Sequence, residues 1–274
     1  MTLCIAAVCQ QRNHGRIVIA TDWKAGSEEF AAENEDKLYW ITDDMPVMIA
    51  GCISRAVELK NTYAQHLVRV SQQNPSITVQ PEDIADLMMR PLAIYRRKRA
   101  NEYTYEKVKL SYKQFLESVG KNQIPRSVAV KIFAELETLD LDAEIIICLF
   151  GGDGTAFVYK VSDEGVELCN NFVAIGTGSR IAEGALYQRK QESRMQVGTT
   201  LYHVFEAMKL GAVSPTVGNE HTLNVLRPRN AQETVKDLML ETSNETDKKL
   251  GKTFARYGPK KMHGMSLPRK AWLG

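Results

Sequence analysis

Residues 1–22, MTLCIAAVCQQRNHGRIVIATD, decide the fold of this chain. Two apolar runs, Leu3–Cys9 and Ile17–Ala20, stand on either side of a polar segment around Arg12 and Gly15. Runs of this length separated by turn-forming residues predict a β-hairpin made of residues 2–9 and 16–22. Nearly every position in the two runs is apolar, which is typical of strands that are covered on both faces. The hairpin is therefore expected inside a stack of two sheets.

The rest of the chain extends this pattern. Residues 37–41 and 47–50 predict a second hairpin. Further strands are expected at 143–150, 155–161, 166–169, 172–175 and 221–227, and helices at 54–73, from 81 to about 99, at about 180–193, 199–211 and 230–243. Along the sequence, the predicted hairpins form two groups, and each group is followed by a pair of predicted helices. This order predicts an α+β fold, a four-layer αββα sandwich in which two antiparallel sheets are flanked by helices.

Domain organisation follows from length and composition. Residues 1–246 of the 274 are expected to form one domain, with a helical insertion at about 76–140. From residue 247 to residue 274 periodicity disappears, glycine, proline and lysine dominate, and lysine and arginine side chains give local positive charge, which predicts a basic, flexible tail.

Charge and hydropathy exclude several classes of partner. The net charge of +2 implies no strong field for nucleic acid or anionic membranes. The basic run Arg96–Arg99 is one weak indication of RNA binding, but a solvated helix end is the favoured interpretation. No apolar stretch approaches the roughly 20 residues of a membrane span, and no basic leader precedes an apolar signal core. A cytoplasmic protein without nucleic-acid or membrane partners is expected.

Cysteine and histidine give no sign of a metal or cofactor site. The five cysteines form no CxxC pair, and the five histidines are not clustered at ligand spacing. Reduced, mostly buried thiols are the favoured interpretation. The turn Gly151–Gly154 lacks the Lys-Ser/Thr of a phosphate-binding loop and predicts a tight hairpin.

Thr2 is the first residue with chemical interest. If Met1 is removed, Thr2 brings a hydroxyl and a free α-amine to the start of a buried strand, so that one residue supplies both nucleophile and base. An α-amine has a reference pKa of about 8, well placed to accept a proton near neutral pH. A nearby lysine ammonium would lower the pKa of both groups.

Five stretches resemble proteasome β-type subunits, especially the bacterial proteasome-like proteins of the HslV and Anbu type. They are Met1–Ala6, Ile17–Lys24, the strand start at Lys37 and Leu38, Met48–Gly51, and Phe172–Ser179 with Ala182–Gly184. The resemblance implies the fold of the N-terminal-nucleophile hydrolases and the activity of a threonine protease. It further implies a homo-oligomeric ring, polypeptide substrates and an ATPase or regulatory partner.

Carried over by position, the resemblance implies a role for each of five residues. Thr2 would be the nucleophile, Lys37 the catalytic lysine and Asp22 its carboxylate partner. Gly51 would offer a backbone N–H to the oxyanion, a contact of about 3–4 kcal/mol. Thr177 stands where family members often carry a serine in a glycine-rich turn, so that a hydroxyl is kept.

Two departures keep other interpretations open. Ser214 and Val217 stand where many β-subunits have a supporting Asp and Ser, and the region 76–140 is longer than the family's helix pair. These departures favour an inactive structural subunit as one alternative. An N-terminal-nucleophile amidase acting on a small amide is a second alternative, and it would need a closed pocket. Taken singly, Asp22 could merely end a strand, and Lys37 could be a solvated charge at a strand start.

Overall fold

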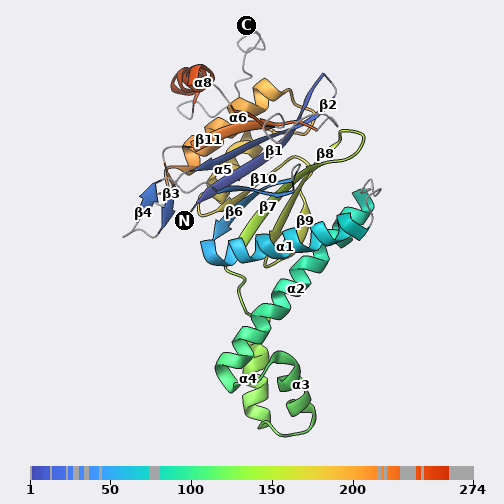
Figure 1. The fold of residues 1–274 in the computed structure, drawn as a ribbon. Helices are drawn as coiled ribbons and strands as arrows, with labels where there is room; N and C mark the ends of the chain where they lie inside the picture. Colours follow the sequence, from blue (N-terminus) through green and yellow to red (C-terminus); the bar gives the residue numbers. More distant parts are fainter. Residues whose placement is uncertain are drawn as a thin grey trace.

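The structure is a computed structural model. It describes residues 2–12, 14–22, 24–26, 31–33, 37–42, 45–73, 81–214, 217–218, 221–228, 239–241 and 244–258. Within these ranges the chain forms two five-stranded antiparallel sheets, a two-stranded ribbon and seven helices (Figure 1).

The first sheet contains the chain's amino-terminal strands. Its order is β10 (Phe172–Gly176), β1 (Leu3–Gln11), β2 (His14–Asp22), β11 (His221–Leu226) and β12 (Met239–Glu241). Strands β1 and β2 pair from Cys4 opposite Thr21 to Gln11 opposite His14, which confirms the hairpin predicted from residues 1–22. On its other edge β1 pairs with β10, with Leu3 opposite Gly176.

The second sheet is a meander. Its order is β5 (Leu38–Thr42), β6 (Met45–Gly51), β7 (Ala143–Phe150), β8 (Ala156–Ser162) and β9 (Gly165–Leu168). The predicted hairpin at 37–50 is confirmed, with an irregularity between Trp40 and Thr42. The two-stranded ribbon is made of β3 (Lys24–Gly26) and β4 (Ala31–Glu33).

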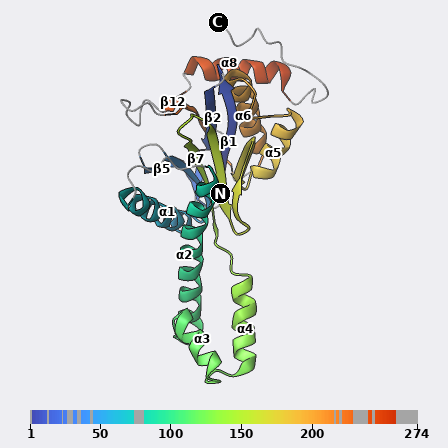
Figure 2. The ribbon, with the colours of Figure 1, turned by 90° about the vertical axis from the view of Figure 1, so that its right-hand side faces the viewer.

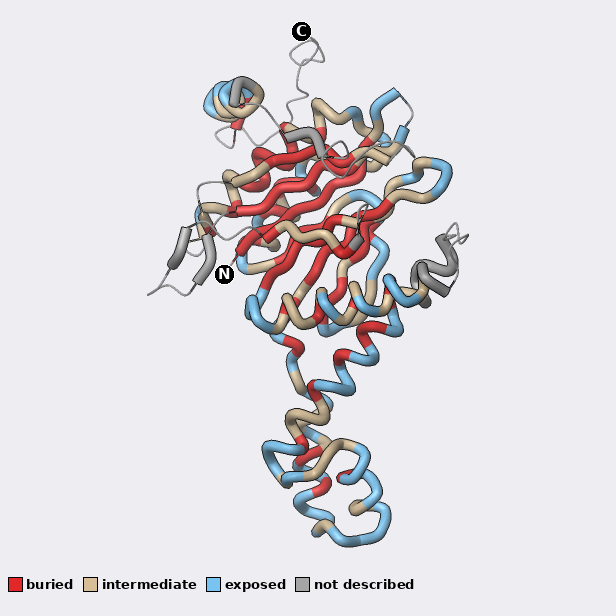
Figure 3. Tube along the Cα trace, viewed as in Figure 1, coloured by how far each residue is buried: buried red, intermediate tan, exposed pale blue. Residues whose placement is uncertain are grey.

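Side-chain alternation along the strands builds three apolar layers. In β1, Leu3 and Ile5 face the helices of the first sheet, whereas Cys4 and Ala6 face the second sheet. The layer between the sheets contains side chains from β1, β2, β6, β7, β8, β10 and β11. Figure 3 shows the buried strands of both sheets as the centre of the molecule. The prediction of strands covered on both faces is confirmed for β1.

Helices cover both outer faces. Helices α5 (Ser179–Gln188) and α6 (Val197–Gly211) pack on the first sheet, and α1 (Ile53–Gln73) and the first half of α2 (Pro81–Val108) pack on the second. The layers are therefore helices, sheet, sheet and helices, and the mixed α+β class with two antiparallel sheets is confirmed. Among the described helices, none is long and apolar enough to cross a membrane.

The predicted insertion has two parts. Met88, Leu92 and Tyr95 of α2 belong to the core of the second sheet, so this half of α2 is part of the outer layer. Pro91 lies within this packed half of α2. Beyond Tyr95 the helix runs away from the sandwich, and α3 (Tyr112–Gly120) and α4 (Arg126–Glu137) lie at its far end (Figure 2). A small core around Phe115 and Ile132 holds this arm together.

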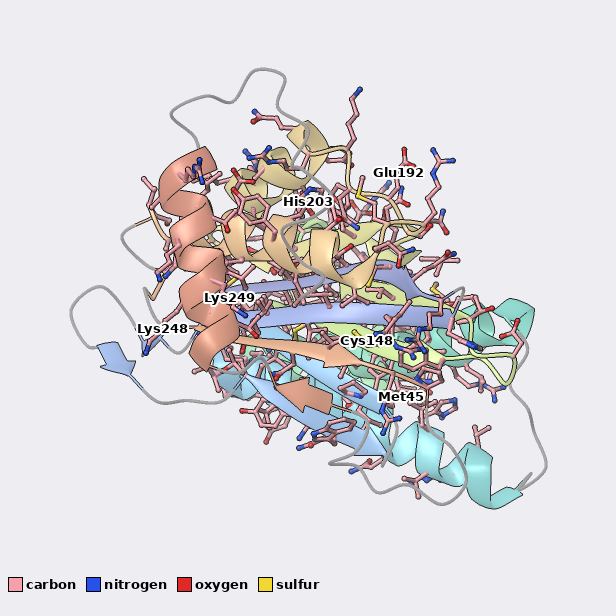
Figure 4. The ribbon with its side chains drawn as sticks, turned by 90° about the horizontal axis from the view of Figure 1, so that it is seen from above. Met45, Cys148, Glu192, His203, Lys248 and Lys249 are labelled. Atoms are coloured by element: carbon pink, nitrogen blue, oxygen red, sulfur yellow. The ribbon has the colours of Figure 1, made fainter. Side chains whose placement is uncertain are left out.

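Two predictions near the carboxyl end need correction. Residues 239–241 form strand β12, where a helix at about 230–243 was expected; residues 229–238 and 242–243 lie outside the described residues. Residues 244–257 form helix α8, where the flexible tail was expected to begin at 247. Leu250 is fully buried in the core between the first sheet and its helices, and Phe254 packs against that core. These two side chains hold α8 on the domain, while Lys248 and Lys249 remain exposed (Figure 4). The tail prediction for residues 259–274 lies outside the described residues.

Candidate functional site

Asp22 is the centre of a buried polar cluster at the end of β2. Its side chain is 0% exposed. Its Oδ1 accepts hydrogen bonds from the Thr2 hydroxyl at 2.7 Å, from the Leu3 N–H at 2.9 Å and from the Lys37 ammonium at 2.6 Å. Its Oδ2 accepts from the Gly218 N–H at 2.9 Å. A buried carboxylate is stable in its charged form only when hydrogen-bond donors and a counter-charge take the place of the water that it gave up.

Lys37 supplies that counter-charge from the other sheet. The residue precedes β5 and is 4% exposed, so it is not the solvated strand-start charge that was one interpretation of the sequence. Its backbone carbonyl accepts a hydrogen bond from the Ile49 N–H at 3.2 Å, which ties it to β6. The Lys37–Asp22 ion pair therefore joins the two sheets at the strand ends beside Thr2.

Thr2 immediately precedes β1 and is held from both sides. Its hydroxyl donates to Asp22, and its carbonyl lies against the turn that follows β10. Gly176, the last residue of β10, has φ of +90°, and a Cβ placed on it would lie 2.1 Å from the Thr2 carbonyl oxygen. Only glycine allows this approach. The Thr177 hydroxyl donates to the same carbonyl at 3.5 Å, so Thr177 supports the Thr2 backbone. Residue Met1 lies outside the described residues.

Gly51 lies at the exposed end of β6, on the second sheet. It has φ of +93°, and a Cβ would lie 2.6 Å from the Asp142 carbonyl oxygen, so this corner requires glycine for packing alone. Gly51 is two residues beyond Ile49, whose carbonyl accepts from the Cys4 thiol at 3.5 Å. The strand that carries Gly51 is thus in contact with the strand that carries Thr2.

The segment around Ser214 and Val217 supports Asp22 in a way the sequence did not indicate. Val217 is buried and packs in the core with Leu3, so its side chain belongs to the apolar core and not to the polar cluster. Its N–H donates to the Ser214 carbonyl at 3.0 Å, and the next residue, Gly218, donates its own N–H to Asp22. A backbone donor is therefore present next to the position where a serine hydroxyl was expected.

Four further contributors were not predicted from the sequence. The Leu3 and Gly218 donors are backbone N–H groups, and no residue type in the sequence predicts them. Cys4 lies beneath the cluster, where burial and the nearby Asp22 charge raise the pKa of its thiol. The fourth, Glu144, accepts a hydrogen bond from the Gly176 N–H at 3.0 Å. It could have been noticed as the single charge in the apolar strand AEIIICLF.

The cluster can hold a hydroxyl and a lysine charge on one carboxylate, out of contact with bulk water. It brings together Thr2, Asp22 and Lys37 through direct hydrogen bonds and Thr177 through the Thr2 carbonyl. No group of three or more His, Cys, Asp or Glu side chains in the described part of the chain could hold a metal ion.

Comparison with known proteins does not assign this site. No protein-family model matches the chain, and no curated protein matches it.

Proposed function

We propose that this protein is a threonine-type peptidase with the N-terminal-nucleophile fold, in which Thr2 is the first residue of the mature chain. The observation that carries the proposal is the triple hydrogen bonding of Asp22 Oδ1 to the Thr2 hydroxyl, the Leu3 N–H and the Lys37 ammonium. The order of layers, two antiparallel sheets between helix pairs, is compatible with that fold.

The reaction needs a base as well as a nucleophile. Cleavage of the Met1–Thr2 bond would give Thr2 a free α-amine beside its own hydroxyl. Because Asp22 is already paired with Lys37, the amine is the group best placed to take the hydroxyl proton. The Thr2 oxygen then attacks the substrate carbonyl carbon, and the oxyanion formed there accepts a hydrogen bond from the Gly51 N–H.

The second half of the reaction returns the enzyme to its starting state. The ammonium formed on Thr2 gives its proton to the leaving amide nitrogen as the C–N bond breaks. An ester between Thr2 and the acyl part of the substrate remains, and water hydrolyses it with the same amine as base. Lys37 contributes positive charge beside the Thr2 hydroxyl, and Asp22 holds both groups in place.

Substrate class and assembly rest on the sequence resemblance. We propose that unfolded or small polypeptides are cut inside a homo-oligomeric ring in the cytoplasm, with an ATPase or regulatory partner supplying substrate. An inactive ring subunit would share the fold and lack turnover. A small-amide hydrolase would turn over a small amide as a monomer.

The test measures hydrolysis of a set of fluorogenic peptides by the wild type and by Thr2→Ala. We expect Thr2→Ala to lose activity by about 10³-fold or more, because no other group replaces the nucleophile. Thr104→Ala is the matched control, since Thr104 is a fully buried threonine on α2 whose hydroxyl donates only to helix carbonyls. It should keep wild-type turnover. Equal activity of Thr2→Ala and wild type would refute the proposal.

A further inference from the structure

Glu144 makes a polar contact between the two sheets beside the candidate site. It lies on β7 of the second sheet, and its Oε2 accepts the N–H of Gly176 on β10 of the first sheet at 3.0 Å. Its other oxygen lies 3.3 Å from the ammonium of Lys160 on β8. Apart from this contact and the Lys37–Asp22 ion pair, the layer between the sheets contains mainly apolar and cysteine side chains, whose contacts are less directional than a hydrogen bond.

The Gly176 end of this contact fixes the position of Thr2. Gly176 pairs with Leu3 in the register of β1 and β10. Its α-carbon lies so close to the Thr2 carbonyl that no side chain fits between them. A shift of Gly176 would therefore move the Thr2 backbone, and with it the hydroxyl.

The Glu144 end fixes the position of Gly51. Glu144 stands opposite Ala50 in the pairing of β6 and β7, and the preceding residue, Ala143, stands opposite Gly51. The Glu144 side chain thus links the end of β10 beside Thr2 to the end of β6 that carries Gly51. These are the two parts of the site that come from different sheets.

We infer that Glu144 is a positioning residue that sets the distance between Thr2 and the Gly51 N–H, with Lys160 holding its carboxylate in place. The inference rests on the proposed function, because a tetrahedral intermediate has to reach the Thr2 oxygen and the oxyanion donor together. A displacement of about 1 Å at a reacting group lowers the rate by about 10²-fold. Glu144 acts only through Gly176 and Gly51.

The expected signature separates positioning from stability. Glu144→Ala removes the acceptor of the Gly176 N–H, and we expect kcat to fall by about 10- to 100-fold with KM changed less than about twofold. Glu144→Gln keeps an oxygen that can accept this N–H, and we expect it to retain kcat within about threefold of the wild type. Hydrogen exchange at the Gly176 amide should accelerate in Glu144→Ala and remain slow in Glu144→Gln.

Glu183 provides a matched control that contacts the same strand, β10. Its Oε1 accepts the Ala174 N–H at 3.2 Å, two residues before Gly176, but it does so from α5 on the outer face. Glu183→Ala therefore removes a comparable contact without touching the link to β6 and Gly51. We expect it to leave kcat within about twofold of the wild type. If Glu144→Ala fails to fold, Glu144→Leu, which keeps the bulk of the side chain, takes its place.

The outcomes distinguish this inference from the proposed function. An active wild type with a slow Glu144→Ala and a fast Glu144→Gln supports the inference. An active wild type whose Glu144→Ala variant has the same kcat, or is slowed no more than Glu183→Ala, overturns the inference and leaves the proposed function standing. A folded wild type that turns over none of the peptides overturns the proposed function and the inference with it.

Discussion

Substitution of Asp22 by asparagine removes the charge from the centre of the buried cluster with little change in shape. Among the described residues, every group within hydrogen-bond distance of the Asp22 carboxylate is a donor: the Thr2 hydroxyl, the Leu3 N–H, the Lys37 ammonium and the Gly218 N–H. Asparagine offers one acceptor oxygen and one NH₂ group. Whichever way the amide turns, its NH₂ points at a donor, and Lys37 loses its counter-charge.

The magnitude follows from burial. Lys37 is 4% exposed and Asp22 is 0% exposed, so the ion pair belongs to the buried class, in which removal of one partner costs about 3–5 kcal/mol. The mismatched NH₂ adds about 1–3 kcal/mol, partly overlapping with the first figure. We expect Asp22→Asn to lower the free energy of unfolding by about 4 kcal/mol. Lys37→Met leaves a carboxylate that still has three donors, and about 3 kcal/mol is expected.

Urea unfolding of the wild type, both single variants and the double variant checks these values. The double variant removes both charges together, so we expect it to be more stable than the sum of the single effects implies, by about 2 kcal/mol or more. Glu117→Gln breaks the exposed Lys113–Glu117 pair, with side chains 77% and 54% exposed, and serves as the control. It should change stability by less than about 0.5 kcal/mol. Single variants that each cost under about 1 kcal/mol, with additive effects, would refute the reasoning.

Two further predictions concern the turn at Gly176 and a buried histidine. Gly176→Ala should lower the free energy of unfolding by about 3 kcal/mol or more and abolish peptide hydrolysis, because its methyl group meets the Thr2 carbonyl and its φ is +90°. Gly184→Ala, in the interior of α5 with open space around it, should raise stability by up to about 1 kcal/mol in the same urea assay. Burial, and then the charge of Arg189, lower the pKa of His203 on α6 to about 4 (Figure 4). His203 of the unfolded chain therefore binds a proton more readily than His203 of the folded chain. The contribution of neutral His203 to the free energy of unfolding is complete above about pH 6.5, and up to about 3 kcal/mol of it is lost as the pH falls to 4. Unfolding measured across this range should show a shallower slope in His203→Gln, and an unchanged slope would contradict the assignment.

The sequence predicted the sheets well because apolar runs carry a strong signal. Residues 3–9 and 143–150 could be recognised as strands, since few other structures bury every residue of so short a segment. The pattern failed at α8, where three lysines among residues 244–257 obscure the helical spacing of Leu250 and Phe254. It failed again at 239–241, because a three-residue edge strand has no period to detect.

The candidate site was predicted only in part. Asp22 and Lys37 could be proposed because their side chains carry the charge that the resemblance implies. The Leu3 and Gly218 donors could not, because a backbone N–H is present at nearly every residue, and only the folded chain selects which one meets Asp22. Glu144 lies between these cases. A charge inside an apolar strand signals a specific contact, but its partner Gly176 is 32 residues away.

The most direct test of the central claim is the intact mass of the protein after reaction with a peptide epoxyketone. The two electrophilic carbons of this reagent can close a ring with the hydroxyl and the α-amine of the same terminal threonine, so the adduct reports nucleophile and base together. Cys52 is exposed, and hydrogen bonding to Ser54 lowers the pKa of its thiol, so the experiment uses Cys52→Ser to remove a competing nucleophile. We predict a chain that begins at Thr2 and carries one reagent at that residue. A folded chain that retains Met1, or one that begins at Thr2 and gains no adduct there, would contradict the account.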